Sequence, residues 1–378
     1  MDDQPADRIE TVVIGGGQAG LAVGHHLSRH GRPFVILEGS DRVGSTWRNR
    51  WEGLRLFTPA QYDGLPGMPF PGPRHSLPTK DAVADYLERY AAAFELPVRT
   101  GIVVDGVALH PSGGWVVSSA GRRWRASSVV LATGAYRAPR VPAFAAELRS
   151  EIRRLHASEY RDPSQLQAGL VLVVGASNSG AEIAMSAVRE HPVILSGRDT
   201  GTMPMRPESR LARLFDPPFW FFINHVVKAD TAIGRRARPM VVDRGGPLER
   251  IWPTDLAAAG VERAFGRTVG VRDGWPVLDD GRVVEAANVI WCTGFRPDFD
   301  LVTPRITGSD GWPIHRRGVV EGVSGLYLIG LPFQHSGASS LLGGVGRDAR
   351  FIADRIAERS ARPRAAVDRL PRAYVDGR

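Results

Sequence analysis

Three glycines near the start of the chain have the spacing of a phosphate-binding turn. They form the pattern G-x-G-x-x-G directly after a short apolar run. In such a turn the first glycine permits the sharp bend, the second lets a pyrophosphate approach the backbone, and the third lets strand and helix pack closely. The positive end of the following helix then faces the phosphates. We predict that a dinucleotide is bound by Gly15, Gly17, Gln18, Ala19 and Gly20.

An acidic residue follows at the distance at which dinucleotide folds hold the ribose. Glu38 ends the next apolar run, 18 residues after Gly20. A carboxylate there accepts hydrogen bonds from ribose hydroxyls and repels a 2′-phosphate. The first site is therefore expected to take FAD or NAD in preference to NADP.

A second, altered turn lies about 160 residues further on. It reads G-A-S-N-S-G, with Ser177 in place of the middle glycine, and Ser196 and Arg198 stand where the first site has Glu38. An arginine without the acid suits a 2′-phosphate, because a charge-assisted hydrogen bond contributes about 1.5–3 kcal/mol. We predict a preference for NADPH over NADH of roughly 10- to 100-fold. The predicted contacts are Gly175, Ala176, Ser177, Asn178, Ser179, Gly180, Ser196 and Arg198.

Both turns require a buried strand before them and a helix after them. Apolar runs precede both turns, and two later apolar runs end in Thr-Gly pairs. A repeated strand–turn–helix–strand pattern indicates an α/β fold with parallel sheets. We predict two Rossmann-like dinucleotide-binding domains, with the NADPH domain at 165–288 inserted into a discontinuous FAD domain at 1–155 and 290–378. Two sites of different polarity indicate hydride transfer from NADPH to a bound flavin.

Local signals predict smaller elements. Helical composition and stop signals predict helices over residues 21–30, 80–93 and 181–190. Thr79 is a suitable N-cap for the second of them. Alternating residues at 115–118 and 123–126 flank a glycine and predict a β-hairpin.

Charge and cysteine content narrow the function classes. The 378 residues carry 48 Lys and Arg against 40 Asp and Glu, a net charge of +8. The arginines are scattered, so we interpret them as surface charge and expect no nucleic-acid partner. Cys292 is the single cysteine, which excludes a disulfide framework, a CxxC redox pair and a thiolate metal cluster. We expect no metal.

We expect neither a signal peptide nor a membrane-spanning helix. The first ten residues are polar and acidic, unlike a signal peptide, and no run of 18 apolar residues occurs. We therefore expect a cytoplasmic protein without membrane contact; whether it forms a homo-oligomer is open.

Five further stretches resemble motifs of a single protein family. Gly44-Ser45-Thr46-Trp47 resembles a G-G-x-W turn, residues 65–71 read L-P-G-M-P-F-P, and an A-T-G motif follows Leu131. Residues 327–331 and 343–346 complete the set. Together they resemble the class B flavin-containing monooxygenase family, especially its plant YUCCA-type and bacterial members, over residues 9–358.

The resemblance implies which further residues face the cofactors. For FAD they are Gly44, Ser45, Thr46, Trp47, Leu56, Ala132, Thr133, Gly134, Gly330 and Leu331. For NADP they are Thr293 and Gly294. The substrate-side candidates, placed by proximity in the family pattern, are Phe57, Thr58 and Gln61.

The resemblance also implies the chemistry. In the family, reduced FAD reacts with O2 to give a C4a-(hydro)peroxyflavin, which passes oxygen to a small organic substrate. That reaction needs a dry flavin pocket and no protein nucleophile, so no catalytic residue is assigned. The alternatives are a flavoprotein NAD(P)H reductase that inserts no oxygen, and a flavin-binding module with incomplete catalysis. A disulfide reductase is disfavoured because Cys292 has no partner.

The family's linker signature is only half present. His156 and Tyr160 fit it, whereas Ser150 and Ile152 stand where phenylalanine and glycine are expected. We interpret His156 as a structural residue. Because Thr58 is followed by proline, the role of the asparagine that animal members carry there is not transferred.

An aromatic stretch at 215–223 has no counterpart among these motifs. It reads F-D-P-P-F-W-F-F-I between basic residues and is too short to span a membrane. Four interpretations stay open: a helix packed into the core, a lid over the site, a tip that dips into a membrane, and a surface that binds a partner.

Overall fold

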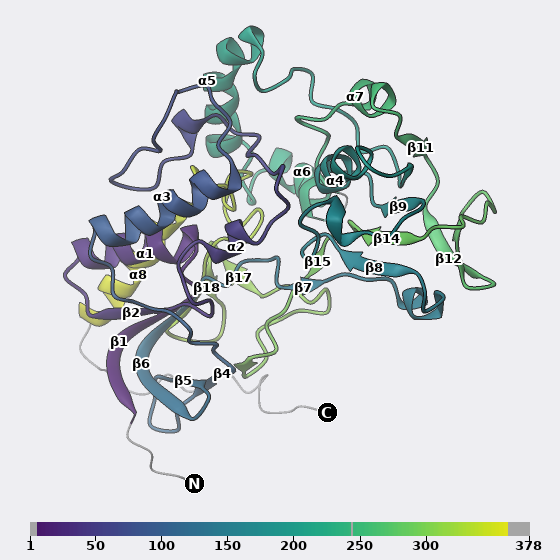
Figure 1. The fold of residues 1–378 in the computed structure, drawn as a ribbon. Helices are drawn as coiled ribbons and strands as arrows, with labels where there is room; N and C mark the ends of the chain where they lie inside the picture. Colours follow the sequence, from purple (N-terminus) through teal and green to yellow (C-terminus); the bar gives the residue numbers. More distant parts are fainter. Residues whose placement is uncertain (1–5, 243–244, 362–378) are drawn as a thin grey trace.

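Two β-sheets organise the structure, a computed structural model that describes residues 6–242 and 245–361 (Figure 1). The first sheet follows the order β16-β4-β5-β6-β1-β2-β3, and β19, β18 and β17 continue from β6. Its central strands β1, β2 and β6 are parallel, as are β6 and β19. The strands are β1 (Asp7–Ile14), β2 (Phe34–Leu37), β3 (Val98–Arg99), β4 (Gly106–Leu109), β5 (Trp115–Ser119), β6 (Arg122–Leu131), β16 (Val302–Thr303), β17 (His315–Arg316), β18 (Val319–Val320) and β19 (Leu326–Leu328).

The second sheet has five parallel strands in the order β11-β10-β9-β14-β8. They are β8 (Arg153–His156), β9 (Val171–Val174), β10 (Val193–Ser196), β11 (Glu262–Ala264) and β14 (Asn288–Trp291). Two antiparallel pairs stand apart, formed by β12 (Thr268–Arg272) with β13 (Trp275–Leu278) and by β7 (Ala138–Pro139) with β15 (Phe295–Arg296). This architecture confirms the predicted α/β class with two Rossmann-type sheets.

Helices cover the sheets. They are α1 (Gln18–Arg29), α2 (Ser45–Arg48), α3 (Lys80–Ala93), α4 (Asn178–Ala187), α5 (Arg210–His225), α6 (Ala232–Val242), α7 (Pro253–Ala258) and α8 (Val345–Ala361), with 3₁₀ turns at Ala60–Tyr62, Ala143–Glu147 and Pro163–Gln165. No helix of the described ranges is long and apolar enough to cross a membrane.

Strand alternation builds a core on each face of the first sheet. Val13 lies in the core that α1, α3 and α8 cover, whereas its neighbours Val12 and Ile14 lie in the core on the opposite face with Trp115. A buried parallel sheet must be apolar on both faces, which explains the continuous apolar run before the first turn.

The predicted local elements are present, with shifted ends. The helix at 80–93 is confirmed as α3, and the Thr79 side chain accepts a hydrogen bond from the Ala82 amide at 3.2 Å. The hairpin is confirmed as β5–β6. Helices α1 and α4 begin three residues earlier than predicted, because the final residues of each glycine turn already form the first helical turn.

The aromatic stretch 215–223 lies in α5, at the top of Figure 1. The interpretation as a helix packed into the core is wrong for most of this stretch. Trp220 is buried, whereas four phenylalanine side chains are 42–62% exposed: Phe215, Phe219, Phe221 and Phe222.

Candidate functional site

The first glycine turn joins β1 to α1 and leaves no room for a side chain at two of its three glycines. A Cβ on Gly15, whose φ is +109°, would lie 2.5 Å from the carbonyl oxygen of Ala132. A Cβ on Gly20 would lie 1.9 Å from the carbonyl oxygen of Gly15. Gly17 has no described protein atom within 4 Å of that position. The turn is therefore closed toward the protein and open at its middle glycine, which fits a pyrophosphate approaching the backbone.

The carboxylate of Glu38 lies beside this turn. It follows β2, and its two oxygens accept hydrogen bonds from the backbone amides of Gly16 at 2.6 Å and Ser40 at 2.9 Å. These bonds fix the carboxylate at the carboxyl edge of the sheet and leave lone pairs free for further donors. Its position fits a ribose-binding acid.

Three neighbouring strands of the first sheet end at the same edge. Gly15 follows β1, residues 132–134 follow β6, and Gly330 and Leu331 follow β19. The Ala132 amide donates to the carbonyl of Ile14 at 2.8 Å, which holds two of these ends together. A Cβ on Gly330 would lie 3.0 Å from that of Ala19. The tertiary structure thus brings the predicted FAD residues from both ends of the chain to one place.

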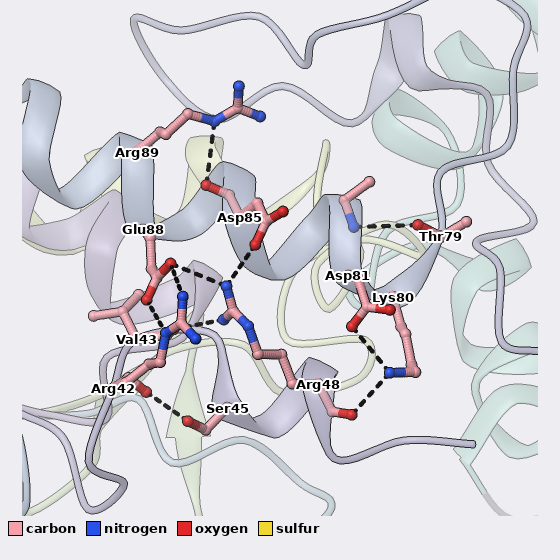
Figure 2. Close-up of polar contacts among 11 residues, drawn as sticks. Arg42, Val43, Ser45, Arg48, Thr79, Lys80, Asp81, Asp85, Glu88 and Arg89 are labelled. Carbon is pink, nitrogen blue, oxygen red and sulfur yellow. Dashed lines mark hydrogen bonds and ion pairs between the residues drawn. The ribbon is translucent and has the colours of Figure 1, made fainter. Parts of the chain in front are cut away.

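The turn at residues 44–47 is attached to α3 by a group of charged side chains (Figure 2). Arg48 pairs with Asp85 at 2.6 Å and with Glu88 at 2.9 Å, and Arg42 also pairs with Glu88. The hydrogen bond from Arg42 holds the pKa of Glu88 below its usual value. Lys80 donates to the backbone carbonyl of Arg48 at 3.0 Å. These contacts position α2 against α3.

The attachment to α3 determines where the predicted cofactor residues of this turn lie. Gly44 has a φ of +82°, and a Cβ there would lie 2.8 Å from the carbonyl oxygen of Ala84 in α3. The Ser45 side chain is buried and donates to the carbonyl of Arg42 at 2.9 Å. The Trp47 indole donates to the Gln18 side chain at 3.3 Å, so it lies over the start of α1. Thr46 is exposed and Leu56 is buried.

The second turn repeats the backbone geometry of the first. Gly175 has a φ of +106°, and a Cβ there would lie 2.3 Å from the carbonyl oxygen of Cys292. A Cβ on Gly180 would lie 1.8 Å from the carbonyl oxygen of Gly175. The serine at the middle position has its own partner: the Ser177 hydroxyl donates to the carbonyl of Gly246 at 2.9 Å. The side chain that replaces a glycine therefore holds a neighbouring loop.

That loop crosses the N-terminus of α4. The Asn178 side chain donates to the carbonyl of Pro247 at 2.9 Å and accepts from the amide of Glu249 at 3.0 Å. Ala176 is buried, whereas Ser179 is partly exposed on the first turn of the helix.

The two residues predicted to select the 2′-phosphate differ in access. Ser196 is fully buried, and its hydroxyl bonds the Thr268 hydroxyl at 2.8 Å. Arg198 is exposed. The guanidinium of Arg198 is therefore the accessible group of the pair.

The Thr-Gly pair after β14 lies between the two sheets. The Thr293 hydroxyl donates to the carbonyl of Arg140, and His156 Nε2 lies 3.0 Å from the carbonyl of Gly294. Because a carbonyl only accepts, Nε2 carries the proton; Nδ1 accepts from the Ser158 amide at 3.2 Å. Burial lowers the pKa of His156. These contacts make His156 a neutral structural link.

Two clusters between the sheets were not predicted from the sequence. The Trp51 indole and Arg250 both donate to the Glu182 carboxylate, at 3.1 and 2.8 Å, which ties the loop after α2 to α4. Arg50 lies over the ring of Phe295, 5.8 Å from its centroid. Neither cluster has a spacing signal, because its members come from separate segments.

One of the three substrate-side candidates lies at a cavity of about 390 Å³. Gln61 lines it directly, and the Tyr62 ring stacks on Trp220 of α5 at 4.9 Å. Thr58 and Phe57 are not among the lining residues; the Thr58 hydroxyl donates to Asp63 at 2.6 Å. The lining is Gln61, Tyr62, Gly64, Leu65, Trp220, Phe221, Asn224, His225 and Gly343.

Asp63 is a buried carboxyl that the sequence analysis missed. It is fully buried, and within the described residues its Oδ2 has no hydrogen-bond partner. Burial raises its pKa to about 7, against the smaller opposing effect of the Thr58 hydrogen bond. Since Thr58 donates to Oδ1, the proton of the neutral acid lies on Oδ2.

Two glycine turns, each at the carboxyl edge of parallel strands, fit a protein that binds two dinucleotides. The sequence profile of the pyridine nucleotide-disulphide oxidoreductase family matches residues 12–232. The chain belongs to this family and, within it, to the class B flavin monooxygenase group, whose members are flavin-dependent oxidoreductases that use FAD and NADPH.

Similar proteins and solved structures include flavin monooxygenases and other oxidoreductases. The chain is 36% identical over 346 residues to the uncharacterized oxidoreductase CzcO-like of Geobacillus kaustophilus, covering 91% of this chain and 97% of that one. It is 29% identical over 397 residues to the probable indole-3-pyruvate monooxygenase YUCCA3 of Arabidopsis thaliana, covering 92% and 86%. The flavin-containing monooxygenase from Stenotrophomonas maltophilia is 27% identical, with a TM-score of 0.72 and coverage of 94% and 100%.

Alanine at Gly17 and at Gly20 is expected to have different effects. Gly20→Ala lowers thermal stability, because its Cβ overlaps the Gly15 carbonyl. Gly17→Ala has room for its methyl group and keeps the wild-type melting temperature without FAD. It weakens FAD binding by about 10-fold or more, since the methyl group occupies the side from which the pyrophosphate approaches.

Circular-dichroism melting of the apoprotein and FAD titration by fluorescence quenching measure the two effects. Wild-type FAD affinity in Gly17→Ala would contradict the assignment of this turn.

Asp63→Asn is expected to remove a pH dependence of stability. The carboxyl loses its proton near pH 4 in the unfolded chain and near pH 7 when folded. Folding therefore becomes less favourable as the pH rises through this window, by up to about 4 kcal/mol. The amide keeps an acceptor for Thr58 and does not titrate, so the stability of the variant relative to wild type increases between pH 4 and 7.

Urea unfolding of the FAD-loaded protein at several pH values tests this. Asp300→Asn, at an exposed carboxyl, is the control and should leave the wild-type curve unchanged. Parallel curves for wild type and Asp63→Asn would show that Asp63 is already ionised near pH 4.

Proposed function

We propose that this protein is an NADPH- and O2-dependent FAD monooxygenase that acts on a small organic substrate. One observation carries the proposal: the chain has two dinucleotide turns but a single cysteine. Burial raises the pKa of the Cys292 thiol, so it is protonated at neutral pH. Electrons from NADPH therefore have no protein dithiol to reduce, and O2 is the acceptor.

The proposed division follows the two sheets. FAD is held by residues 1–155 and 290–378, with its pyrophosphate at Gly17 and its ribose at Glu38. NADPH is held by residues 165–288. The open space at Gly17 and the backbone-anchored Glu38 carboxylate support the first assignment. The repeated turn at β9–α4 supports the second.

The overall reaction consumes one NADPH, one proton and one O2 for each oxygenated product, and the second oxygen atom leaves as water. Bound FAD supplies the redox chemistry. The protein binds both nucleotides, positions the substrate and excludes water. We propose that the substrate occupies the cavity at Gln61, where the stacked rings of Tyr62 and Trp220 reduce access of water.

Oxygen insertion is tested by supplying ¹⁸O2 and NADPH to the FAD-loaded protein with amines, sulfides and α-keto acids. We expect one substrate to raise NADPH consumption and to gain one labelled oxygen atom. Rapid reduction of ferricyanide or a quinone, with no label in any product, would favour a reductase that inserts no oxygen. A protein that never takes up FAD would contradict both functions.

Two variants of α5 link this test to the cavity. Trp220→Ala removes the ring that stacks on Tyr62 and should raise the share of O2 released as hydrogen peroxide. Phe219→Ala, at the exposed neighbouring position, is the control and should leave that share at the wild-type value without lipid present. An equal peroxide share in both variants would place the substrate elsewhere.

Arg198→Ser is expected to raise the KM for NADPH by roughly 10- to 100-fold, because the lost bond to the 2′-phosphate is charge-assisted. The KM for NADH should change little, since NADH lacks that phosphate. Arg189→Ser, at another exposed arginine just after α4, controls for net charge. Equal loss with both nucleotides would show that Arg198 does not select the phosphate.

A further inference from the structure

Helix α5 presents an apolar stripe to solvent. Five large side chains recur at helical spacing, at positions i, i+3, i+4, i+8 and i+11, and Pro218 fills position i+7. At 100° per residue they span an arc of about 140°. The side chains are 42–70% exposed, and they belong to Leu211, Leu214, Phe215, Phe219 and Phe222.

The opposite side of α5 faces the protein and is partly polar. It carries Ala212, Asp216, Trp220 and Asn224, spaced four residues apart. The Asn224 side chain accepts a hydrogen bond from Arg347 of α8 at 2.9 Å, and Trp220 stacks on Tyr62. These contacts fix the rotation of the helix. A surface helix usually buries its apolar side, so α5 has the reverse orientation.

The segment that carries this stripe has a positive net charge. Residues 206–238 contain seven Lys and Arg against three Asp and Glu, a net charge of +4. Arg210 and Arg213 are exposed on α5, and within the described chain neither forms an ion pair, whereas Arg206 pairs with Asp255 at 2.8 Å. At 100° per residue, Arg210 lies about 40° beyond the edge of the stripe and Arg213 lies on the opposite side of the helix. Of the three acids, Asp216 lies on the inner side of the helix. The exposed part of this segment is therefore apolar along the stripe and basic beyond its edge.

We propose that α5 docks this protein on an anionic lipid bilayer, with the stripe among the headgroups and the arginines against lipid phosphates. An exposed aromatic stripe within a basic segment is the chemistry of an interfacial helix. A second copy of the chain fits the same face less well, because two segments of charge +4 would meet. Docking of this kind needs no membrane-spanning helix.

The test is flotation of the FAD-loaded protein with vesicles of phosphatidylglycerol and phosphatidylcholine, and with vesicles of phosphatidylcholine alone. We expect binding to the anionic vesicles, weakened by about 0.5 M salt because ions screen the arginines. Phe215→Ser combined with Phe222→Ser should lower the partition coefficient by roughly 10-fold or more, since two apolar side chains lose their insertion.

A control variant distinguishes binding by α5 from non-specific binding of exposed apolar side chains to vesicles. Phe265→Ser replaces a phenylalanine that is 68% exposed in the loop between β11 and β12, and should float as wild type does. An FAD absorbance spectrum and a melting curve check that each variant is folded.

The possible outcomes are distinct. Vesicle binding that is lost in the double variant and kept in Phe265→Ser supports the proposal. Wild-type protein that never floats, or a double variant that floats equally well, overturns it. A wild-type dimer by light scattering that becomes a monomer in the double variant, without vesicle binding, would assign the face to a second copy of the chain.

Discussion

Both nucleotide sites depend on a glycine turn, β1–α1 in the first sheet and β9–α4 in the second. In each turn the helix starts so close to the end of the strand that a Cβ does not fit. At Gly20 and Gly180 the missing side chain lets each helix touch the carbonyl oxygen of the preceding turn. At Gly15 and Gly175 the absence of a side chain lets the turn contact the backbone that follows the neighbouring strand, β6 and β14 respectively. A larger residue would push the helix off the sheet edge and separate the strand ends that form each nucleotide site.

Polar side chains connect these two edges. Glu182 of α4 accepts hydrogen bonds from Trp51, which follows α2, and from Arg250. Buried polar groups must keep their partners, because an unpaired group in the interior costs more free energy than the bond contributes. Such contacts fix one relative arrangement of their segments, whereas apolar packing tolerates small shifts. The serine in the second turn acts similarly, since it holds the loop that crosses α4.

Two features depart from the rule that apolar groups are inside and polar groups outside. Asp63 is a buried carboxyl with an oxygen that has no partner in the described part of the chain, and α5 turns its aromatic side outward. Both adjoin the same cavity, through the loop of Gln61 and through Trp220. Departures of this kind concentrate at functional sites, where local stability is given up for binding or chemistry.

The sequence by itself determined the α/β class, both glycine turns, the helix at 80–93 and the hairpin, because these depend on spacing and on φ angles that glycine alone adopts easily. Only the tertiary structure decided that Ser196 is buried while Arg198 is accessible, that Asp63 lacks a partner, and that α5 faces outward. Periodicity shows that a helix has two sides; which side meets the protein depends on contacts with residues far away in the chain, here those of Trp220 and Asn224.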